Sequence, residues 1–589
     1  MAGLIKRRWV YEVVYAGLVV GAAALVLSPV LRRSGWPLAE ASTAPLILVQ
    51  MYAAHFRHLD FLPVWSSSDG IGMGSPVLLY YHRAFFWIAG FIYILVGSDL
   101  KFAVVATIAI FLAVGAYGMR LALSVITDSR LLCTVGSLGF LFTNYVFGDW
   151  FDPRGDLAEF SALMVVPWLL YWCLNLVKHR RVSFLLIPIM VVLVNAHSAI
   201  ALVSLLALVT ALIAFVAFAG LEGLRAIAVR LAISIGGAAL ILAPILVAEL
   251  RFSRYYDPQT KAASGQYTVS NQFVSVWWYF YDHAHRWLAP GHVFVQIDFV
   301  IWVPIVAALV GGVAHWVLTG SRALPGSLRK PVPVFLLAGL AVYLFMQLRI
   351  SLWVYRVLAP FQVIAFPWRM LAFITPLGIL LVVQIADRAM RRYPIKALWR
   401  VLAGIWLAAL IVLSPINSSL GENYGFLAAP GQFPFLQLFA APSRVNYQRF
   451  NGFFLGTGTG ALYGVFLPKV YNPDGIELAD DDIPYRNLHS HDEGAASLSR
   501  VPCTVAGPNN APFETLELTF SVSCAGATRL ALPVSINAFS RVFVRNAAGK
   551  LRQIPYSHAR TDPRMIIDVA DPGPETVVVH LPTLWGTLF

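Results

Sequence analysis

Residues 158–181 read AEFSALMVVPWLLYWCLNLVKHRR, an apolar run of about 20 residues that ends in a basic cluster. A helix of this length crosses the hydrocarbon core of a bilayer, and Lys and Arg beside a span favour its cytoplasmic side. The whole chain of 589 residues is similarly apolar: 58% of its residues are hydrophobic and 12% are charged, with a mean hydropathy of +0.70. Soluble proteins carry about twice that charged fraction. The sequence therefore predicts a polytopic α-helical membrane protein.

Apolar segments of this kind recur along the chain and predict about 11 spans. They are 10–31, 101–125, 131–148, 158–177, 182–196, 198–219, 228–248, 294–319, 332–347, 368–388 and 398–416. The first is too long for a signal-peptide core, so we interpret it as a retained span. Basic runs at 178–181, 225–230, 322–330 and 388–396 alternate with the spans as the positive-inside rule requires. We therefore expect a cytoplasmic N-terminus. The loops 32–75, 149–157, 249–293 and 348–367, and everything after Pro415, are expected on the outer face.

The apolar stretch 76–97 does not fit this alternation. Counting it as a span would place Arg120 and Arg130 on the outer face. His82 and Arg83 interrupt the stretch, and a polar pair in mid-bilayer is costly unless it faces a cavity. We therefore predict a juxtamembrane or re-entrant segment on the outer side.

The composition changes after residue 416. Residues 417–490 are rich in Gly, Pro, Asn and Phe and are predicted to form a periplasmic connecting region. In residues 491–589, short alternating runs lie between turn residues, which is typical of a small β-sandwich. Cys503 and Cys524 lie in this predicted periplasmic β domain, where an oxidising compartment would allow them to form a disulfide.

The predicted outer loops carry more ionisable and aromatic side chains than membrane anchoring requires. The candidate acidic residues are Glu40, Asp156 and Glu159, and the candidate substrate-binding residues are Arg57, Asp60, Trp65, Asp69, Arg154, His197, Trp277, Trp278 and Arg369. Glu159 enters a span, where an unpaired carboxylate is costly, so it requires a partner such as Arg154. The net charge of +13 does not indicate a nucleic-acid partner, because Lys and Arg cluster beside the apolar segments.

The sequence leaves the need for a metal open. Asp282, His283 and His285 could hold a divalent ion such as Mg²⁺ or Mn²⁺, but their spacing is not diagnostic. The neighbouring Trp277 and Trp278 could instead form an interfacial belt or a stacking platform for a sugar.

Several short motifs occur in an order that resembles a known family. They are Pro63-Val64-Trp65, Gly72-Met73-Gly74-Ser75-Pro76, Tyr80-Tyr81, Arg154-Gly155-Asp156-Leu157-Ala158-Glu159, Asn195-Ala196-His197 and Phe366-Pro367-Trp368-Arg369. Over residues 1–470 the chain resembles the bacterial membrane family labelled "6-pyruvoyl-tetrahydropterin synthase related". The label implies no pterin chemistry. That family is similar to the GT-C glycosyltransferase superfamily.

The resemblance implies a GT-C-like transmembrane domain over residues 1–416 in the bacterial inner membrane. It implies an enzyme that moves a sugar from a polyprenyl-phosphate donor to a lipid- or glycan-linked acceptor at the outer face, in contact with membrane lipids. The family's second acidic position falls on Glu159, with Asp156 beside it.

The first acidic position of the GT-C pattern, the catalytic base, falls on Glu40. The sequence departs from the pattern there, because Asp is commoner and the His five residues further on is replaced by Pro45. Asp60 and Asp69 therefore remain alternative bases.

In such a reaction the leaving lipid phosphate requires positive charge, which Arg369 or Arg154 could supply. Two other functions remain open. A glycan polymerase or ligase would use the same face and the same lipid phosphate, but would rely more on Arg and His than on carboxylates. A lipid or polysaccharide transporter would carry ionisable residues at mid-span, often within inverted repeats.

Overall fold

The computed structural model describes residues 2–32, 36, 43–67, 74–151, 154–253, 256–257, 269–273, 297–319, 330–413, 467–468, 496–497, 501–507, 514–535, 537–546, 549–559, 562–570 and 572–588. Contacts divide the chain into two compact units. Unit 1 comprises residues 1–42, 105–241 and 267–428, and unit 2 comprises residues 43–104, 242–266 and 429–589. The predicted connecting region 417–490 lies almost entirely outside the described residues, so its boundaries stay a prediction.

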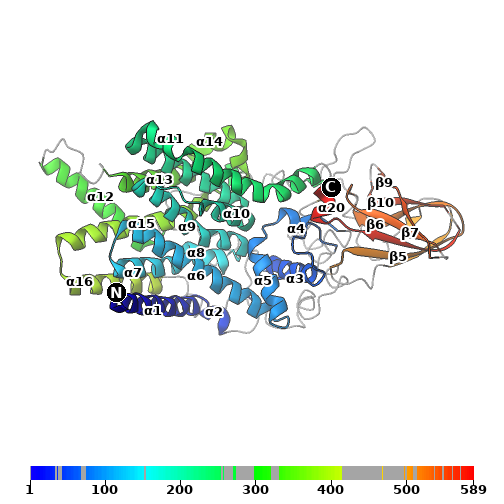
Figure 1. Ribbon diagram of the computed structural model, residues 1–589, viewed down its shortest axis with the longest axis horizontal. Helices are drawn as coiled ribbons and strands as arrows, with labels where there is room; N and C mark the ends of the chain where they lie inside the picture. The colour runs from blue at the N-terminus through cyan, green and yellow to red at the C-terminus, as the bar shows by residue number, and fades with distance from the viewer. Residues whose placement is uncertain are drawn as a thin grey trace. The chain divides into compact units, whose positions relative to one another are not determined.

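Unit 1 is helical (Figure 1). Its long helices are α1 (Ala2–Val26), α6 (Leu100–Ile126), α7 (Arg130–Leu141), α9 (Leu157–His179), α10 (Leu186–Ala196), α11 (Ser198–Phe252), α12 (Phe299–Thr319), α13 (Pro331–Gln347), α15 (Leu371–Arg392) and α16 (Lys396–Leu413), of which α6 and α11 continue into unit 2. Its short helices are α2 (Ser28–Leu31), α8 (Asn144–Trp150), α14 (Leu352–Val357), η1 (Val269–Asn271), η4 (Arg349–Ser351), η5 (Ala359–Ile364) and η6 (Pro367–Met370).

Helix α15 is the core of unit 1. It packs against α7, α8, α9, α12 and α13, and every residue from Leu371 to Leu381 is buried. Apolar side chains cover its whole circumference in this half, as expected for a helix that is surrounded by other helices. The segment just before α15 is therefore held firmly in place, and Arg369 lies in that segment.

Six helices in the described part of the chain are long and apolar enough to cross a membrane, and the bent pair α13 with η4 and α14 would make a seventh. These helices support a polytopic membrane protein. Helix α10 has 11 residues and rises about 16 Å, which is short for a crossing of the expected span 182–196. The expected total of about 11 spans therefore remains a prediction.

Helix α11 accounts for two expected spans, 198–219 and 228–248. Gly220 within it has φ 69° and ψ 179°, so two helices meet there. Glycine adopts this left-handed backbone conformation without steric cost. The chain thus changes direction between the two predicted spans, at the point where the sequence predicts a loop.

The stretch 76–97 forms two helices, α4 (Val77–Tyr80) and α5 (Ala84–Leu95), which belong to unit 2. The break between them contains His82 and Arg83, the polar pair that argued against a span. Helix α5 has 12 residues, or about 18 Å, which is too short to cross the hydrocarbon core. Its predicted place on the outer side stays a prediction.

The C-terminal part of unit 2 contains two antiparallel sheets, and β5, β6, β7, β9 and β10 are labelled in Figure 1. One has the order β3 (Ala496–Ser497), β6 (Thr528–Ser535), β10 (Asp562–Val569), β9 (Tyr556–Ala559). The other has the order β4 (Cys503–Ala506), β5 (Glu517–Cys524), β11 (Gly573–His580), β7 (Arg541–Arg545), β8 (Leu551–Ile554). A two-residue pair, β1 (Tyr256–Asp257) and β2 (Leu467–Pro468), and helices α3 (Thr43–Arg57) and α20 (Leu584–Leu588) complete the described elements of unit 2.

Exposed and buried residues alternate along β5, so its sheet buries one face, as the sequence predicted. Cys503 and Cys524 are cross-strand partners on β4 and β5 and form a disulfide. The predicted pairing of these two cysteines is confirmed. Cys133 and Cys173 are buried free thiols.

A carboxylate from the segment before β5 is buried against the first loop of unit 2. Glu514 accepts hydrogen bonds from Ser66 Oγ at 2.6 Å and from the backbone N–H of Ser67 at 2.7 Å. Its Oε2 also lies 3.6 Å from His55 Nε2, and His55 Nδ1 pairs with Asp60 at 3.0 Å. Glu514 and His55 are 1% and 2% exposed, so their charges are stabilised by each other and not by water.

Candidate functional site

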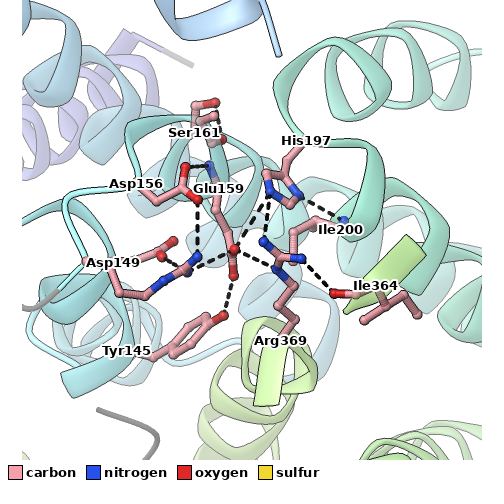
Figure 2. Close-up of polar contacts among 11 residues, drawn as sticks. Tyr145, Asp149, Asp156, Glu159, Ser161, His197, Ile200, Ile364 and Arg369 are labelled. Atoms are coloured by element: carbon pink, nitrogen blue, oxygen red, sulfur yellow. Dashed lines mark hydrogen bonds and ion pairs between the residues drawn. The ribbon is translucent and has the colours of Figure 1, made fainter. Parts of the chain in front are cut away.

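Five of the residues that the sequence singled out lie together in unit 1, in a buried cluster around Glu159 (Figure 2). Four of them lie at or beside a helix end, and Arg154 lies in the loop that precedes α9. Asp156 caps the N-terminus of α9, where its Oδ1 accepts the backbone N–H of Glu159 at 3.1 Å. His197 lies between α10 and α11, and Arg369 lies in η6 before α15. Three separate chain segments therefore bring charged groups to one place.

Glu159 is the centre of the cluster and is fully buried. Its Oε2 accepts a hydrogen bond from Arg369 Nε at 2.9 Å and lies 2.9 Å from Arg154 Nη1. Its Oε1 accepts the Tyr145 hydroxyl at 2.5 Å. A buried carboxylate persists only when paired and hydrogen-bonded, and here every partner that the sequence argument required is present.

Arg154 links Glu159 to two further carboxylates. Its Nη1 also donates to Asp149 Oδ1, and its Nη2 donates to Asp156 Oδ2 at 3.1 Å. Burial alone lowers the pKa of the Arg154 guanidinium, but the carboxylates of Glu159, Asp149 and Asp156 outweigh burial and hold this pKa well above its usual value. The guanidinium also lies 4.4 Å from the centre of the Trp368 ring, a cation–π contact. Arg154 is thus held from all sides.

The guanidinium of Arg369 makes fewer close contacts with carboxylates than that of Arg154. Its Nη1 donates to the Ile364 carbonyl at 2.6 Å, and its Nη2 lies 3.5 Å from His197 Nε2. His197 Nδ1 accepts the backbone N–H of Ile200 at 3.3 Å, so a neutral His197 carries its proton on Nε2. Glu159 Oε2 lies 3.7 Å from His197 Nε2. The contact between Arg369 Nη2 and His197 is therefore long and weak.

A divalent cation does not fit this arrangement, although Asp156, Glu159 and His197 each bring a ligand atom within 4.8 Å of the others. Glu159 Oε2, the oxygen nearest His197, already has two guanidinium nitrogens at 2.9 Å. A metal on that oxygen would face two positive charges in a low-dielectric interior. The two arginines take the place that the cation would occupy.

We expect a chelator to leave this site unchanged. EDTA, Mg²⁺ and Mn²⁺ should not change the thermal unfolding temperature of the detergent-solubilised protein, because Arg154 and Arg369 already neutralise Glu159. The measurement is a melting curve in each condition. A metal-dependent rise that disappears in Asp156→Asn would contradict the prediction.

A comparison of this chain with protein-family models and with curated proteins finds no match in either case. The resemblance of its motifs to a membrane glycosyltransferase family therefore remains a prediction.

Three other predicted substrate-binding residues belong to unit 2. Arg57 donates to Ser98 Oγ at 2.9 Å, and Asp60 pairs with His55. Trp65 is 1% exposed and packs against Phe252, with ring centres 6.1 Å apart. These contacts are structural, and the buried Trp65 ring offers no accessible face on which a sugar could stack.

Four predicted residues lie outside the described part of the chain: Glu40, Asp69, Trp277 and Trp278. The topology also predicts that Glu40, Asp156, Glu159, His197 and Arg369 line one outward-facing cavity. The structure brings the last four together in a buried cluster, and the cavity, its outward side and the place of Glu40 stay predictions. Asp282, His283 and His285 also lie outside the described residues.

Sequence reasoning did not select Tyr145 and Asp149, although both complete the cluster. Tyr145 lies within an expected apolar span, where one Tyr among many aromatic residues gives no signal. Asp149 is 1% exposed, and its position five residues before Arg154 was the one available clue. Its Oδ2 has no hydrogen-bond partner within the described residues.

Proposed function

We propose that this chain is a membrane glycosyltransferase of GT-C type with about 11 spans, acting on a polyprenyl-phosphate sugar. The observation that carries the proposal is Arg369, which is 8% exposed, is fixed through Nε and Nη1, and places Nη2 in a long contact of 3.5 Å with His197. A buried guanidinium whose outer nitrogen is only weakly held is suited to a phosphate oxygen. The sugar would move to a lipid- or glycan-linked acceptor at the outer face of the inner membrane.

The position of the cluster favours transfer over transport. Asp156 and His197 lie between helices, Arg369 lies in the short helix η6 just before α15, and Glu159 lies in the first turn of α9. A transporter would place such groups near the middle of its spans, commonly where helices are broken. Charged groups at the ends of spans are instead within reach of a lipid headgroup at the membrane surface.

Each group in the cluster would have a distinct role. Arg369 would bind the donor phosphate and stabilise the charge that develops on it as the sugar leaves. Glu159 would orient Arg369 and Arg154 and would not take a proton itself, because both of its oxygens already accept hydrogen bonds or ion pairs. The base that accepts the acceptor's hydroxyl proton is proposed to be Glu40, with Asp60 and Asp69 as the alternatives.

Donor binding tests this proposal without requiring the identity of the sugar. Native mass spectrometry of the full chain should detect bound polyprenyl phosphate. Arg369→Lys keeps the charge but loses the second nitrogen of the fork, so we expect affinity to fall about tenfold or more.

The matched control for this measurement is Arg356→Lys, because Arg356 is an exposed arginine on α14 of the same unit. Its affinity for polyprenyl phosphate should equal that of the wild type. Equal binding by wild type and Arg369→Lys would count against a phosphate role for Arg369.

A further inference from the structure

A second candidate site lies in unit 2. A cavity of about 760 Å³ is lined by the end of α11, the turn before β7, the junction of β8 and β9, and α20. All of these segments belong to unit 2, whereas the cluster around Glu159 belongs to unit 1. The cavity is open to one side, and its volume is within the range of sites that bind a small molecule or one or two sugar rings.

The charges that line this cavity are positive. Arg251 and Arg541 both contribute to its wall, and none of the described lining residues is acidic. Arg541 has no acidic partner within the described residues, because the nearby Glu517 pairs with His580 at 3.3 Å. Arg251 Nη1 donates to the backbone carbonyl of Thr587, which fixes the side chain but does not neutralise it. Two guanidinium groups without carboxylates favour an anionic ligand.

The uncharged part of the wall is amphipathic. Phe539 and Tyr556 supply aromatic surface, and Gln553 supplies an amide that can donate or accept hydrogen bonds. Such a combination suits a sugar, which has an apolar ring face and a polar rim. A simple ion would use only the arginines.

The turn that carries these groups is preorganised. Asn537 Oδ1 accepts the backbone N–H groups of Phe539 and Ser540 at 2.9 and 2.8 Å. The Tyr556 hydroxyl donates to the Asn537 carbonyl at 2.6 Å, and the Phe539 ring packs against Phe252 with centres 4.6 Å apart. Because this part of the wall is already ordered, ligand binding should cost little additional conformational entropy.

We infer that this cavity binds an anionic saccharide, a sugar unit that carries a carboxylate or a phosphate group. Arg251 and Arg541 bind the charged group, and Phe539 and Tyr556 contact the ring. A lipid headgroup would satisfy the arginines but would leave the aromatic surface and Gln553 unused. The inference goes beyond the proposed transfer reaction and does not depend on it, because no residue of unit 1 takes part.

Calorimetric titration of the full chain in nanodiscs made of neutral lipid tests the inference. The probes are tetragalacturonate for the carboxylate, glucose 1-phosphate for the phosphate, and cellotetraose as the neutral saccharide. We expect at least one anionic probe to bind about tenfold or more tighter than cellotetraose, because each charged contact contributes about that factor. Arg541→Gln should weaken its binding by a similar factor.

The matched control is Arg545→Gln, because Arg545 is exposed on the same strand but does not line the cavity. It should bind like the wild type. The inference is overturned if neither anionic probe binds, if Arg545→Gln and Arg541→Gln lose binding equally, or if phosphatidylglycerol in the nanodisc displaces the saccharide completely. The last result would assign the two arginines to a lipid headgroup.

Discussion

Replacing Glu159 by alanine is expected to destabilise unit 1 by about 3–5 kcal/mol, the cost of removing one partner from a buried ion pair. Arg154 and Arg369 would both lose their shared carboxylate while remaining 7% and 8% exposed. We expect a much lower yield of folded protein and a lower thermal unfolding temperature in detergent. Fluorescence-detected size-exclusion chromatography after heating measures both.

Two further variants separate charge balance from a general loss of packing. Glu222→Ala removes an exposed carboxylate on α11 and should behave like the wild type. The double variant Glu159→Gln with Arg369→Gln removes one charge of each sign, leaves Arg154 paired with Asp149 and Asp156, and should recover part of the loss, because Glu159 and Arg369 are directly coupled. Equal unfolding temperatures for Glu159→Ala and Glu222→Ala would contradict this account of the cluster.

The second large effect is expected at Glu514. Glu514→Ala leaves Ser66, the backbone of Ser67 and the His55 ring buried without their acceptor. Unsatisfied buried donors cost about 1–3 kcal/mol each, so we expect unit 2 to lose about 3 kcal/mol or more of stability. The exposed neighbour Glu517 provides the control, and Glu517→Ala should change stability little.

This contact also predicts a dependence on pH. Burial lowers the pKa of His55, but the hydrogen bond with Asp60 and the nearby Glu514 carboxylate outweigh burial and raise the pKa from 6.5 to about 9. The charged form is therefore favoured by folding, so its contribution is fully present below pH 6.5 and is lost as the pH rises through about 9. A shift of this size corresponds to about 3 kcal/mol.

Unfolding of the wild type between pH 6 and pH 10, compared with His55→Gln, measures this dependence. The wild type should lose stability across the window, whereas His55→Gln should lose distinctly less because it does not titrate there. Parallel curves for the two proteins would place the pH dependence at another group.

Part of the fold could be predicted from the sequence, because apolar length and basic flanks report directly on membrane spans. The expected span 158–177 corresponds to α9. The polar pair His82 and Arg83 lies at a break between two short helices, as the sequence predicted. The pairing of Cys503 with Cys524 followed from composition in a small β region. These are local signals, which a chain shows without tertiary contacts.

The rest depends on contacts between residues that are distant in sequence. The grouping of Asp156, Glu159, His197 and Arg369 was predicted from topology, because a polar group at a span's end needs a partner. Tyr145 could not be selected in this way. Nor could Glu514, which lies 448 positions from Ser66. In the sequence, Glu514 resembles a solvent-exposed carboxylate between strands, because its partners Ser66 and Ser67 lie in a distant segment.

Mass spectrometry of lipid extracts from a strain that lacks this chain tests the proposed transfer most directly. We predict that a polyprenyl-phosphate sugar accumulates, and that its mass identifies the donor. Expression of the wild-type chain or of Arg356→Lys should remove it, whereas Arg369→Lys, present in the membrane in equal amount, should not. Extracts without any accumulated polyprenyl-phosphate sugar, or with an accumulation that Arg369→Lys clears as well as the wild type, would contradict the account.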